Sequence, residues 1–365
     1  MKPFNRLFIS TAKFLYPIYW MISKLRIDNA GMPFSHAKSI LIFDFHLIGD
    51  IVLLIPFLSA VRRGYPDAKI TLVAGPWASE VLKGSMLIDE IKIFQAPWVK
   101  KIGFISGLFA CCRLINELSK FKWDLGIEIR GDARQILLLW IIGPNRRVGF
   151  NFTGGRQLLT DIVPDDGRLR HLGLHHLNMA NYLNIWKYQD EYSPSISLNV
   201  SELKEAAQIP GFIGFHFGAS LPLRRFPENE ISNLLSKFSG SNKYLIIFLP
   251  PGDNKKLINL IDNFPESLRK NVIFWSGNLR KMIILISRAE HMYVMDSGPA
   301  HISAALNIPT TVFYGPANYE YVFPIGRDVR IISNDNLACR PCNQKKCTND
   351  VYQLCFKGLA DKISV

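Results

Sequence analysis

The sequence has no apolar run long enough to cross a membrane. Its longest apolar stretches, such as Ile51 to Leu58, are far shorter than the ~20 residues that a bilayer-spanning helix needs. Six cysteines in 365 residues are too few for a disulfide scaffold, so we expect a reducing compartment. These shortages exclude a polytopic membrane protein and a disulfide-stabilised one.

Three common nucleotide-site motifs are also missing. Neither G-x-G-x-x-G nor G-x-x-x-x-G-K-[ST] occurs, which removes the main support for a dehydrogenase or an NTPase. No two aspartates are spaced two apart, so the D-x-D pair with which many sugar-transfer enzymes hold a metal ion and a nucleotide diphosphate is absent. A nucleotide site in this chain must use other residues.

What the chain does have is apolar material and positive charge. It is 48% hydrophobic and 20% charged, which is typical of a globular chain and excludes disordered, collagenous and low-complexity proteins. Its 43 Lys and Arg residues exceed its 30 Asp and Glu residues, giving a net charge of +13. Nucleic acid, anionic lipid headgroups and phosphorylated sugars are the partners that this charge favours.

The first 38 residues differ from the rest. From Met1 to Lys24 there are four cations, many aromatic and aliphatic side chains, and no acid. Two interpretations stay open: a basic amphipathic anchor on a membrane surface, or a helix lying on the body of its own protein. Lys13 and Pro17 interrupt the apolar pattern, which argues against a secretory signal.

From Ser39 onward, apolar runs rich in Ile, Val and Phe alternate with helix-like stretches, and after a polar passage the alternation begins again. Two such arrays predict an α/β fold of two doubly wound, Rossmann-like domains, over 39–200 and 210–335, with a Cys-containing tail and closing helix over 336–365. The ligand cleft is expected between the domains, at the carboxyl ends of the strands. The expected strands are Ser39–Phe45, Lys69–Ala74, Ile88–Phe94, Asp124–Ile129, Arg147–Phe150, Phe212–Phe217, Lys243–Leu249, Asn271–Trp275, His291–Met295 and Thr310–Tyr314.

The segment after the first strand ends in Gly49 and Asp50. Gly49 permits a tight turn, and Asp50 falls where a helix is expected to begin. A carboxylate at a helix amino terminus is held ionised by the dipole, which suits a general base, but it is also a common N-cap. Pro56 predicts a kink or a later helix start.

Two further loops carry anion-binding residue types. Ser220, Arg224 and Arg225 follow the first strand of the second array, where small residues and arginines suit a diphosphate. The second loop opens a helix with Pro299 near its first position, and its candidate residues are Asp296, Ser297, Gly298 and His301. Solvated arginines and a structural histidine are the alternatives.

Four cysteines, Cys339, Cys342, Cys347 and Cys355, occur within 355 − 339 + 1 = 17 residues. That density favours a metal site, although zinc ribbons usually place a longer interval between two C-x2-C pairs. A structural Zn²⁺ site, an iron–sulfur site and free thiols all remain open.

Taken together, these segments resemble glycosyltransferase family nine, the heptosyltransferases of bacterial lipopolysaccharide assembly. The resemblance runs from about Ser39 to the end of the chain. It departs at Phe45-His46, where small hydroxyl residues are common, and at Arg224, where lysine is usual. The matching stretches are Ile40 to Pro56, Tyr65 to Ile70, Gly218 to Pro227, Asp296 to His301 and Phe313 to Pro316.

The resemblance implies a GT-B fold and metal-independent, inverting sugar transfer without a catalytic cofactor. It implies that Asp50 is the general base, with Gly49 in its turn, and that Asp253 meets the nucleoside. The donor diphosphate region would be held by Ser220, Arg224, Arg225, Asp296, Ser297, Gly298 and His301.

The implied partners are a nucleotide diphosphate sugar, with ADP-heptose expected, an anionic lipid-linked saccharide acceptor and a membrane surface. The implied location is the cytoplasm, peripheral on the inner membrane face. The alternatives are a GT-B protein that binds sugar nucleotides without transfer, or a basic nucleic-acid-binding protein. The second lacks every common nucleic-acid readout motif, so nucleic acid is not expected as a partner.

Overall fold

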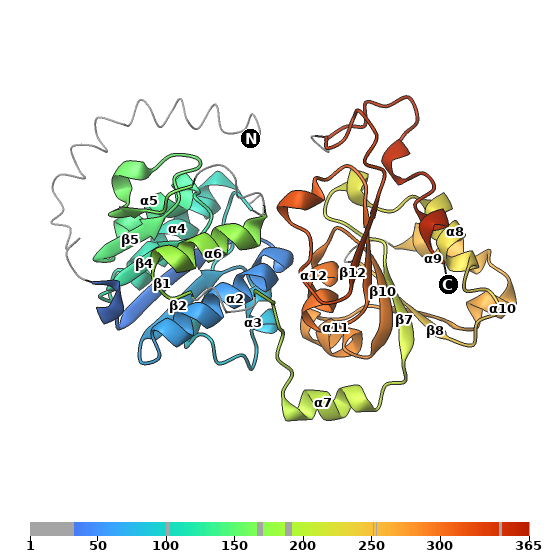
Figure 1. Ribbon diagram of the computed structural model, residues 1–365, viewed down its shortest axis with the longest axis horizontal. Coiled ribbons are helices and arrows are strands. Elements are labelled where there is room, and N and C mark those ends of the chain that lie inside the picture. Colours follow the sequence, from blue (N-terminus) through green and yellow to red (C-terminus); the bar gives the residue numbers. More distant parts are fainter. Residues whose placement is uncertain are drawn as a thin grey trace. The chain divides into compact units, whose positions relative to one another are not determined.

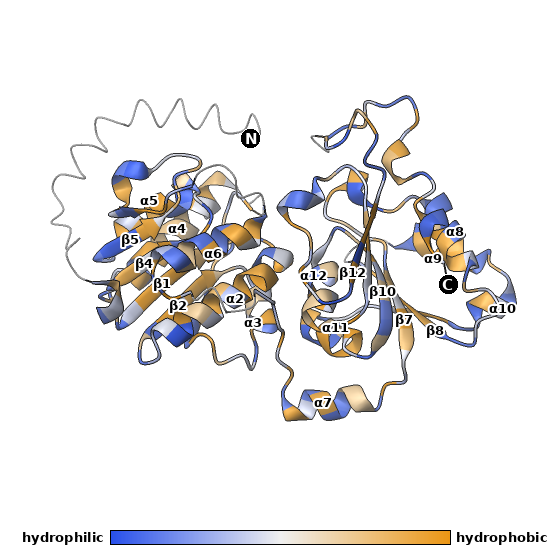
Figure 2. Cartoon of the chain, in the orientation of Figure 1, coloured by the Kyte–Doolittle hydropathy of each residue, from blue (hydrophilic) through white to orange (hydrophobic). Residues whose placement is uncertain are grey.

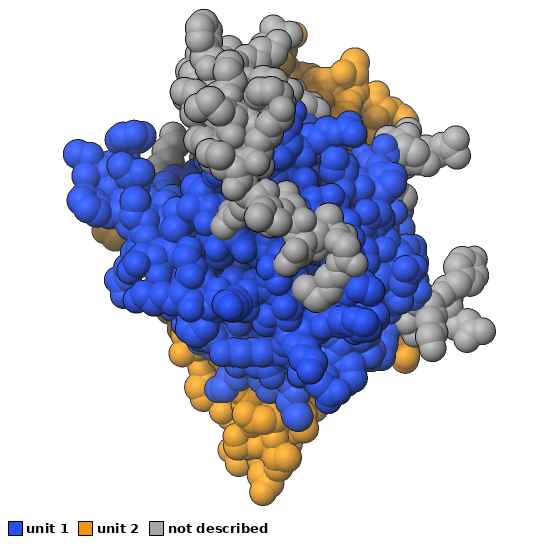
Figure 3. Space-filling view, turned by 90° about the vertical axis from the view of Figure 1, so that its left-hand side faces the viewer, with its two compact units in different colours: residues 1–192 blue, residues 193–365 orange. Residues whose placement is uncertain are grey.

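The computed structural model describes residues 33–99, 103–165, 171–186, 192–250, 252, 254–342 and 345–364. The chain divides into two compact units, Met1–Tyr192 and Ser193–Val365, which Figure 3 colours separately. The boundary between the two units falls after Tyr192. The predicted amino-terminal anchor, Met1 to Lys24, lies outside the described residues.

Unit 1 is built on one sheet of six parallel strands in the order β3-β2-β1-β4-β5-β6, among the residues described. Its central strand β1 is buried over five of its six residues, which explains why its sequence does not alternate between apolar and polar side chains. The strands are β1 (Ser39–Asp44), β2 (Lys69–Ala74), β3 (Glu90–Ile93), β4 (Leu125–Glu128), β5 (Arg146–Gly149) and β6 (Asp161–Ile162).

Helices connect these parallel strands and cover the sheet (Figure 1). Helix α2 begins at Ile48 and continues through Pro56. The alternative expectation that the helix begins later because of this proline was therefore wrong. The helices of unit 1 are α2 (Ile48–Gly64), α3 (Trp77–Val81), α4 (Phe104–Leu118), α5 (Ala133–Ile142) and α6 (Leu172–Tyr182), with short turns η1 (Phe34–His36) and η2 (Arg156–Leu158).

Unit 2 repeats the same topology. Its six parallel strands lie in the order β12-β11-β10-β7-β8-β9, which is the strand order of unit 1 read from the other edge. The strands are mostly hydrophobic along their length (Figure 2). They are β7 (Phe212–His216), β8 (Tyr244–Phe248), β9 (Val272–Trp275), β10 (Ala289–Met295), β11 (Thr310–Tyr314) and β12 (Val329–Ser333).

The carboxyl-terminal tail packs on unit 2. Phe356, Leu359 and Ile363 are buried in the same apolar core as β7 and β10 residues. The expected closing helix is instead two single turns, η5 (Leu354–Phe356) and η6 (Ala360–Lys362), separated by Gly358 at φ +73°. The helices of this unit are α7 (Val200–Ala207), α8 (Glu228–Ser236), α9 (Lys255–Asp262), α10 (Glu266–Arg269), α11 (Leu279–Ile286) and α12 (Gly298–Ala305), with turns η3 (Pro222–Arg224) and η4 (Tyr319–Tyr321).

Both sheets reverse their strand order next to the first strand, between β1 and β4 in unit 1 and between β7 and β10 in unit 2. Open α/β sheets bind ligands outside the carboxyl ends of the strands at such a switch point. We therefore expect ligand-binding residues in the loops that follow β1, β4, β7 and β10. No helix in the described part of the chain is long and apolar enough to span a bilayer.

Candidate active site

Asp50 lies in the first turn of α2, two residues after the helix begins at Ile48. Its Oδ2 accepts a hydrogen bond of 2.9 Å from the backbone N–H of Leu47, the residue that precedes the helix. Asp50 is thus the acidic residue at the third helical position, not the N-cap itself. This contact fixes the carboxylate at the turn through Gly49 and leaves Oδ1 for another partner.

That other partner is Arg130, at the end of β4. Its NH1 lies 3.1 Å from Asp50 Oδ1, and both side chains are mostly buried. The pair therefore bridges the ends of β1 and β4, where unit 1 has its switch point. The guanidinium holds the Asp50 carboxylate in one position at this edge of the sheet.

The turn that carries Arg130 is held by the buried Glu128. Its Oε1 accepts from the Arg130 N–H at 3.2 Å, and its Oε2 accepts from the Gly131 N–H at 2.6 Å. Burial and the charge of Asp132 raise the pKa of Glu128 well above its usual value, despite these hydrogen bonds. Gly131 has φ +65°, and a Cβ there would lie 2.6 Å from the Phe152 ring, so the turn requires glycine.

A histidine follows β1 beside the same loop. His46 Nδ1 lies 3.1 Å from Oδ1 of the fully buried Asp44, and the His46 backbone N–H donates to the same oxygen. Burial alone would raise the pKa of Asp44, but the hydrogen bond and charge of His46, together with the charges of Arg130 and His176, outweigh it, so this pKa lies below its usual value. In the sequence His46 departs from the family pattern, and it was not among the predicted site residues.

In unit 2 the loop after β7 meets the loop after β10. Arg224, in η3, places NH1 2.9 Å from Oδ2 of Asp296, which is almost fully buried. Two of the residues assigned to the donor site are therefore partners of each other. The helix that follows, α12, has Ser297 as its N-cap residue.

Ser297 also links these two loops. Its hydroxyl donates to the Met295 carbonyl at 3.0 Å, so its oxygen is left to accept from His216 Nδ1 at 3.2 Å. Burial lowers the pKa of His216 to about 4, so this histidine is neutral at physiological pH. His301 is also buried, inside α12, instead of lying at the helix surface.

Three other predicted donor residues, Ser220, Arg225 and Gly298, lie on or next to these two loops. Gly218 is buried, and a Cβ there would come within 2.9 Å of Pro250, so the loop after β7 passes close to the end of β8. Ser220 and Arg225 are exposed, and Arg225 Nε donates to the Ala219 carbonyl at 3.4 Å. Gly298 begins α12 and is half-buried. Asp253 lies outside the described residues.

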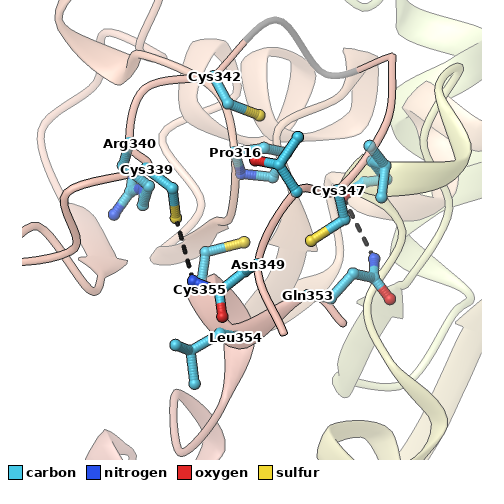
Figure 4. Close-up of a pocket in the computed structure, with 11 residues that line it drawn as sticks. Pro316, Cys339, Arg340, Cys342, Cys347, Asn349, Gln353, Leu354 and Cys355 are labelled. Carbon is cyan, nitrogen blue, oxygen red and sulfur yellow. Dashed lines mark hydrogen bonds between the residues drawn. The ribbon is translucent and has the colours of Figure 1, made fainter. Parts of the chain in front are cut away.

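The four clustered cysteines line one pocket, as Figure 4 shows. Asn349 Nδ2 lies 3.7 Å from Cys339 Sγ, and burial raises the pKa of the Cys355 thiol to about 11. All four are free thiols. Across the described residues, no three His, Cys, Asp or Glu side chains are arranged to hold a metal ion.

Sequence reasoning missed Arg130 and Glu128. The signal was present, because Glu128 lies at the end of the expected strand Asp124–Ile129 and Arg130 directly follows it. Parallel strands end at one edge of the sheet. What the sequence does not reveal is that this strand lies beside β1, since two other strands intervene along the chain.

Comparison with known proteins decides the family. The model of "Glycosyltransferase family 9 (heptosyltransferase)" matches residues 111–353, well over half of the chain. This chain belongs to glycosyltransferase family 9. The family resemblance inferred from the motifs is thereby confirmed, and the chain is a glycosyltransferase.

Individual relatives of this glycosyltransferase agree. Lipopolysaccharide heptosyltransferase 1 of Pseudomonas aeruginosa is 32% identical over 305 residues, covering 82% of this chain and 85% of the relative. The solved family 9 glycosyltransferase of Veillonella parvula has a TM-score of 0.71 at 21% identity, covering 82% and 87% of the two chains. E. coli ADP-heptose lipopolysaccharide heptosyltransferase II has a TM-score of 0.69 at 18% identity, covering 82% and 91%. The predicted α/β, GT-B fold class is confirmed.

Proposed function

We propose that this glycosyltransferase moves a heptose from ADP-heptose to a lipopolysaccharide-type saccharide acceptor. The names of its relatives support the donor and the acceptor class. The observation that carries the proposal is the Asp50–Arg130 pair at the switch point of unit 1, in a chain of this family.

In the proposed reaction, Asp50 removes the proton from the attacking hydroxyl of the acceptor. The hydroxyl oxygen forms a bond to the anomeric carbon, the bond from that carbon to the diphosphate breaks, and ADP leaves with the electron pair. A placed base of this kind contributes ~10²–10⁴-fold to the rate. A single displacement from the face opposite the leaving group inverts the anomeric centre, so we propose an inverting transfer.

The leaving diphosphate is proposed to bind at the switch point of unit 2. Arg224 and Arg225 supply positive charge, and the backbone amides of Ser297 and Gly298 open α12 beside them. Ser220, Asp296 and His301 complete this site, and Asp253 is proposed to contact the nucleoside. Fixed arginines and a helix start neutralise the charge that develops on the diphosphate, so we propose transfer without a metal ion or another catalytic cofactor.

We also propose that the enzyme works in the cytoplasm, on the inner face of the membrane. A lipid-linked anionic acceptor suits a chain of net charge +13, and the stretch from Met1 to Lys24 has the composition of an interfacial anchor. Deleting that stretch is expected to release the protein from anionic vesicles at moderate salt. Unchanged vesicle binding would instead favour a helix lying on its own protein.

A structural Zn²⁺ bound by Cys339, Cys342, Cys347 and Cys355 remains a separate proposal. Its support is that all four thiols line one pocket. Because they do not form a ligand group as they stand, binding requires this segment to rearrange and the thiols to lose their protons.

The test is to supply purified enzyme with ADP-heptose and lipopolysaccharide that lacks heptose. Release of ADP, together with a gain of one heptose in the mass of the acceptor, is the expected result. Tight binding of ADP-heptose without turnover on any acceptor would favour a non-transferring GT-B protein. Salt-dependent binding to generic DNA, with no response to sugar nucleotides, would favour a nucleic-acid-binding protein.

A further inference from the structure

One helix of unit 1 carries an apolar face that the fold does not bury. Four large side chains in the first two turns of α4 are exposed: Phe104 by 86%, Ile105 by 68%, Leu108 by 56% and Phe109 by 71%. Their spacing places them along one side of the helix. Contiguous exposed apolar side chains of this size mark an interaction surface more often than scattered single ones do.

The opposite side of α4 already performs the structural role. Gly107, Leu114 and Leu118 are buried, and Leu114 and Leu118 belong to an apolar core of unit 1. Ala110 packs against the same core. One side of the helix therefore packs on unit 1, and the first two turns expose the other side to solvent. We call this exposed side the α4 face; it consists of Phe104, Ile105, Leu108 and Phe109.

The described residues beside the α4 face carry positive charge and no acid. From Phe104 to Asn116 the helix contains no Asp or Glu, and Arg113 is exposed on it. Glu117, in the last turn of α4, pairs with Lys92. Exposed aromatic and aliphatic side chains beside a cation, without acids, are the composition of a helix that lies in the interface of an anionic bilayer. A second copy of this chain, itself strongly basic, lacks that complementarity.

The α4 face belongs to the unit that carries Asp50, the proposed base for the acceptor hydroxyl. Helices that follow the strands of a parallel sheet begin at the edge where the strands end, so the first turns of α4 start at the edge that carries Asp50. The segment before α4 also touches the β1 loop, because the rings of Trp98 and Phe45 lie 6.1 Å apart. Phe45 lies five residues before the candidate base Asp50 in the chain.

We propose that the α4 face docks on an anionic lipid membrane and holds the strand-end edge of unit 1 next to lipid-linked acceptors. The role of the acceptor rests on the proposed function, whereas the docking itself does not. The α4 face is separate from the amino-terminal stretch Met1 to Lys24. The proposal therefore gives the described residues a membrane contact that does not depend on that stretch.

The test compares the full-length chain with the variant F104S/F109S, using vesicles with and without anionic lipid. The variant is expected to partition onto anionic vesicles at least ~10-fold less than the wild type, because two large apolar side chains no longer enter the interface. The matched control is V200S/L203S, which removes two exposed apolar side chains from α7 in unit 2 and should leave partitioning unchanged. Melting temperatures of all three proteins confirm that each is folded.

Two results would overturn the proposal. Vesicle binding that is equal in wild type and F104S/F109S would assign any membrane contact to another segment, such as Met1 to Lys24. A dimer in sedimentation analysis that the variant abolishes, without an effect on vesicles, would make the α4 face a contact between copies. Transfer to a delipidated saccharide acceptor, measured in parallel, separates this failure from failure of the proposed function, because that reaction does not need the membrane.

Discussion

Arg130 NH1 lies 3.1 Å from Asp50 Oδ1, although the two residues are eighty positions apart in the chain. Each carboxylate oxygen of Asp50 already has one donor, Leu47 N–H on Oδ2 and Arg130 on Oδ1. A carboxylate offers about four acceptor positions, so each oxygen retains one for an incoming hydroxyl. The base is thus oriented before the acceptor arrives.

The first prediction concerns this orientation. Arg130→Gln removes the charge and shortens the side chain, so Asp50 loses its fixed partner. We expect kcat to fall about ten- to a hundredfold, with the Kd for ADP unchanged, because loss of orientation affects the reacting geometry and not the donor site. Arg130→Lys should restore part of the loss. Equal kcat values for wild type and Arg130→Gln would show that the pair is only structural.

The second prediction concerns the donor site of unit 2. Arg224→Ala should weaken ADP binding about ten- to a hundredfold, since a charge-assisted contact contributes roughly 1.5–3 kcal/mol. Titration calorimetry measures this directly, and Arg269→Ala on α10 is a control that removes an equally cationic but exposed side chain. If the Kd is the same for both variants, Arg224 serves only to pair with Asp296 and the diphosphate binds elsewhere.

The third prediction concerns pH. Burial lowers the pKa of His216 to about 4, below the usual 6.5. Between pH 6.5 and pH 4, this histidine is therefore protonated in the unfolded chain but neutral in the folded protein. Stability attributable to this residue is therefore complete above pH 6.5 and declines towards pH 4, by about 3 kcal/mol at most. The same sign applies to His176, whose pKa is also lowered to about 4 by burial.

The measurement is the unfolding free energy of wild type and His216→Gln between pH 7 and 4. Glutamine cannot be protonated and retains a donor for Ser297, so the variant should lose less stability on acidification. Glu128, whose pKa is raised, contributes with the opposite sign, so the difference between the two proteins is the informative quantity. Parallel curves would show that His216 does not resist protonation.

The two-domain α/β architecture could be predicted from the sequence, because parallel strands that are buried on both faces consist of consecutive apolar residues. β2 and β11 occur at the expected residues, and other strands differ by one or two positions at their ends. The sequence did not predict β6, a two-residue strand, or β12, whose residues are mostly half-buried. Short or edge strands carry too little apolar pattern to be distinguished from loops.

The candidate site was predictable only within single loops. Asp50, Ser297 and Arg224 each stand in a local pattern that suggests a helix start or an anion site. Their partners depend on which strands are neighbours, and that depends on tertiary structure. The contacts of Asp50 with Arg130 and of Arg224 with Asp296 were therefore not foreseen.

The fourth prediction concerns the cysteines. If the pocket takes a structural metal, protein purified under reducing conditions should contain about one equivalent of Zn, and Cys339→Ser should lower both the Zn content and the melting temperature. Turnover per folded molecule should stay unchanged, because the site is structural. Less than about half an equivalent of Zn or Fe by elemental analysis would rule out the metal and leave four free thiols.

The most direct test of the account is the turnover of Asp50→Asn with ADP-heptose and an acceptor lipopolysaccharide that lacks heptose. Asparagine keeps the size of the side chain and an oxygen for the Leu47 N–H, but it cannot accept the proton. Asp262→Asn, an exposed position at the end of α9, is the matched control. The account predicts that only Asp50→Asn lowers kcat by at least ~10²-fold, with melting temperature and ADP affinity near wild type. Turnover that survives in Asp50→Asn, or that falls only in step with lost stability, would contradict it.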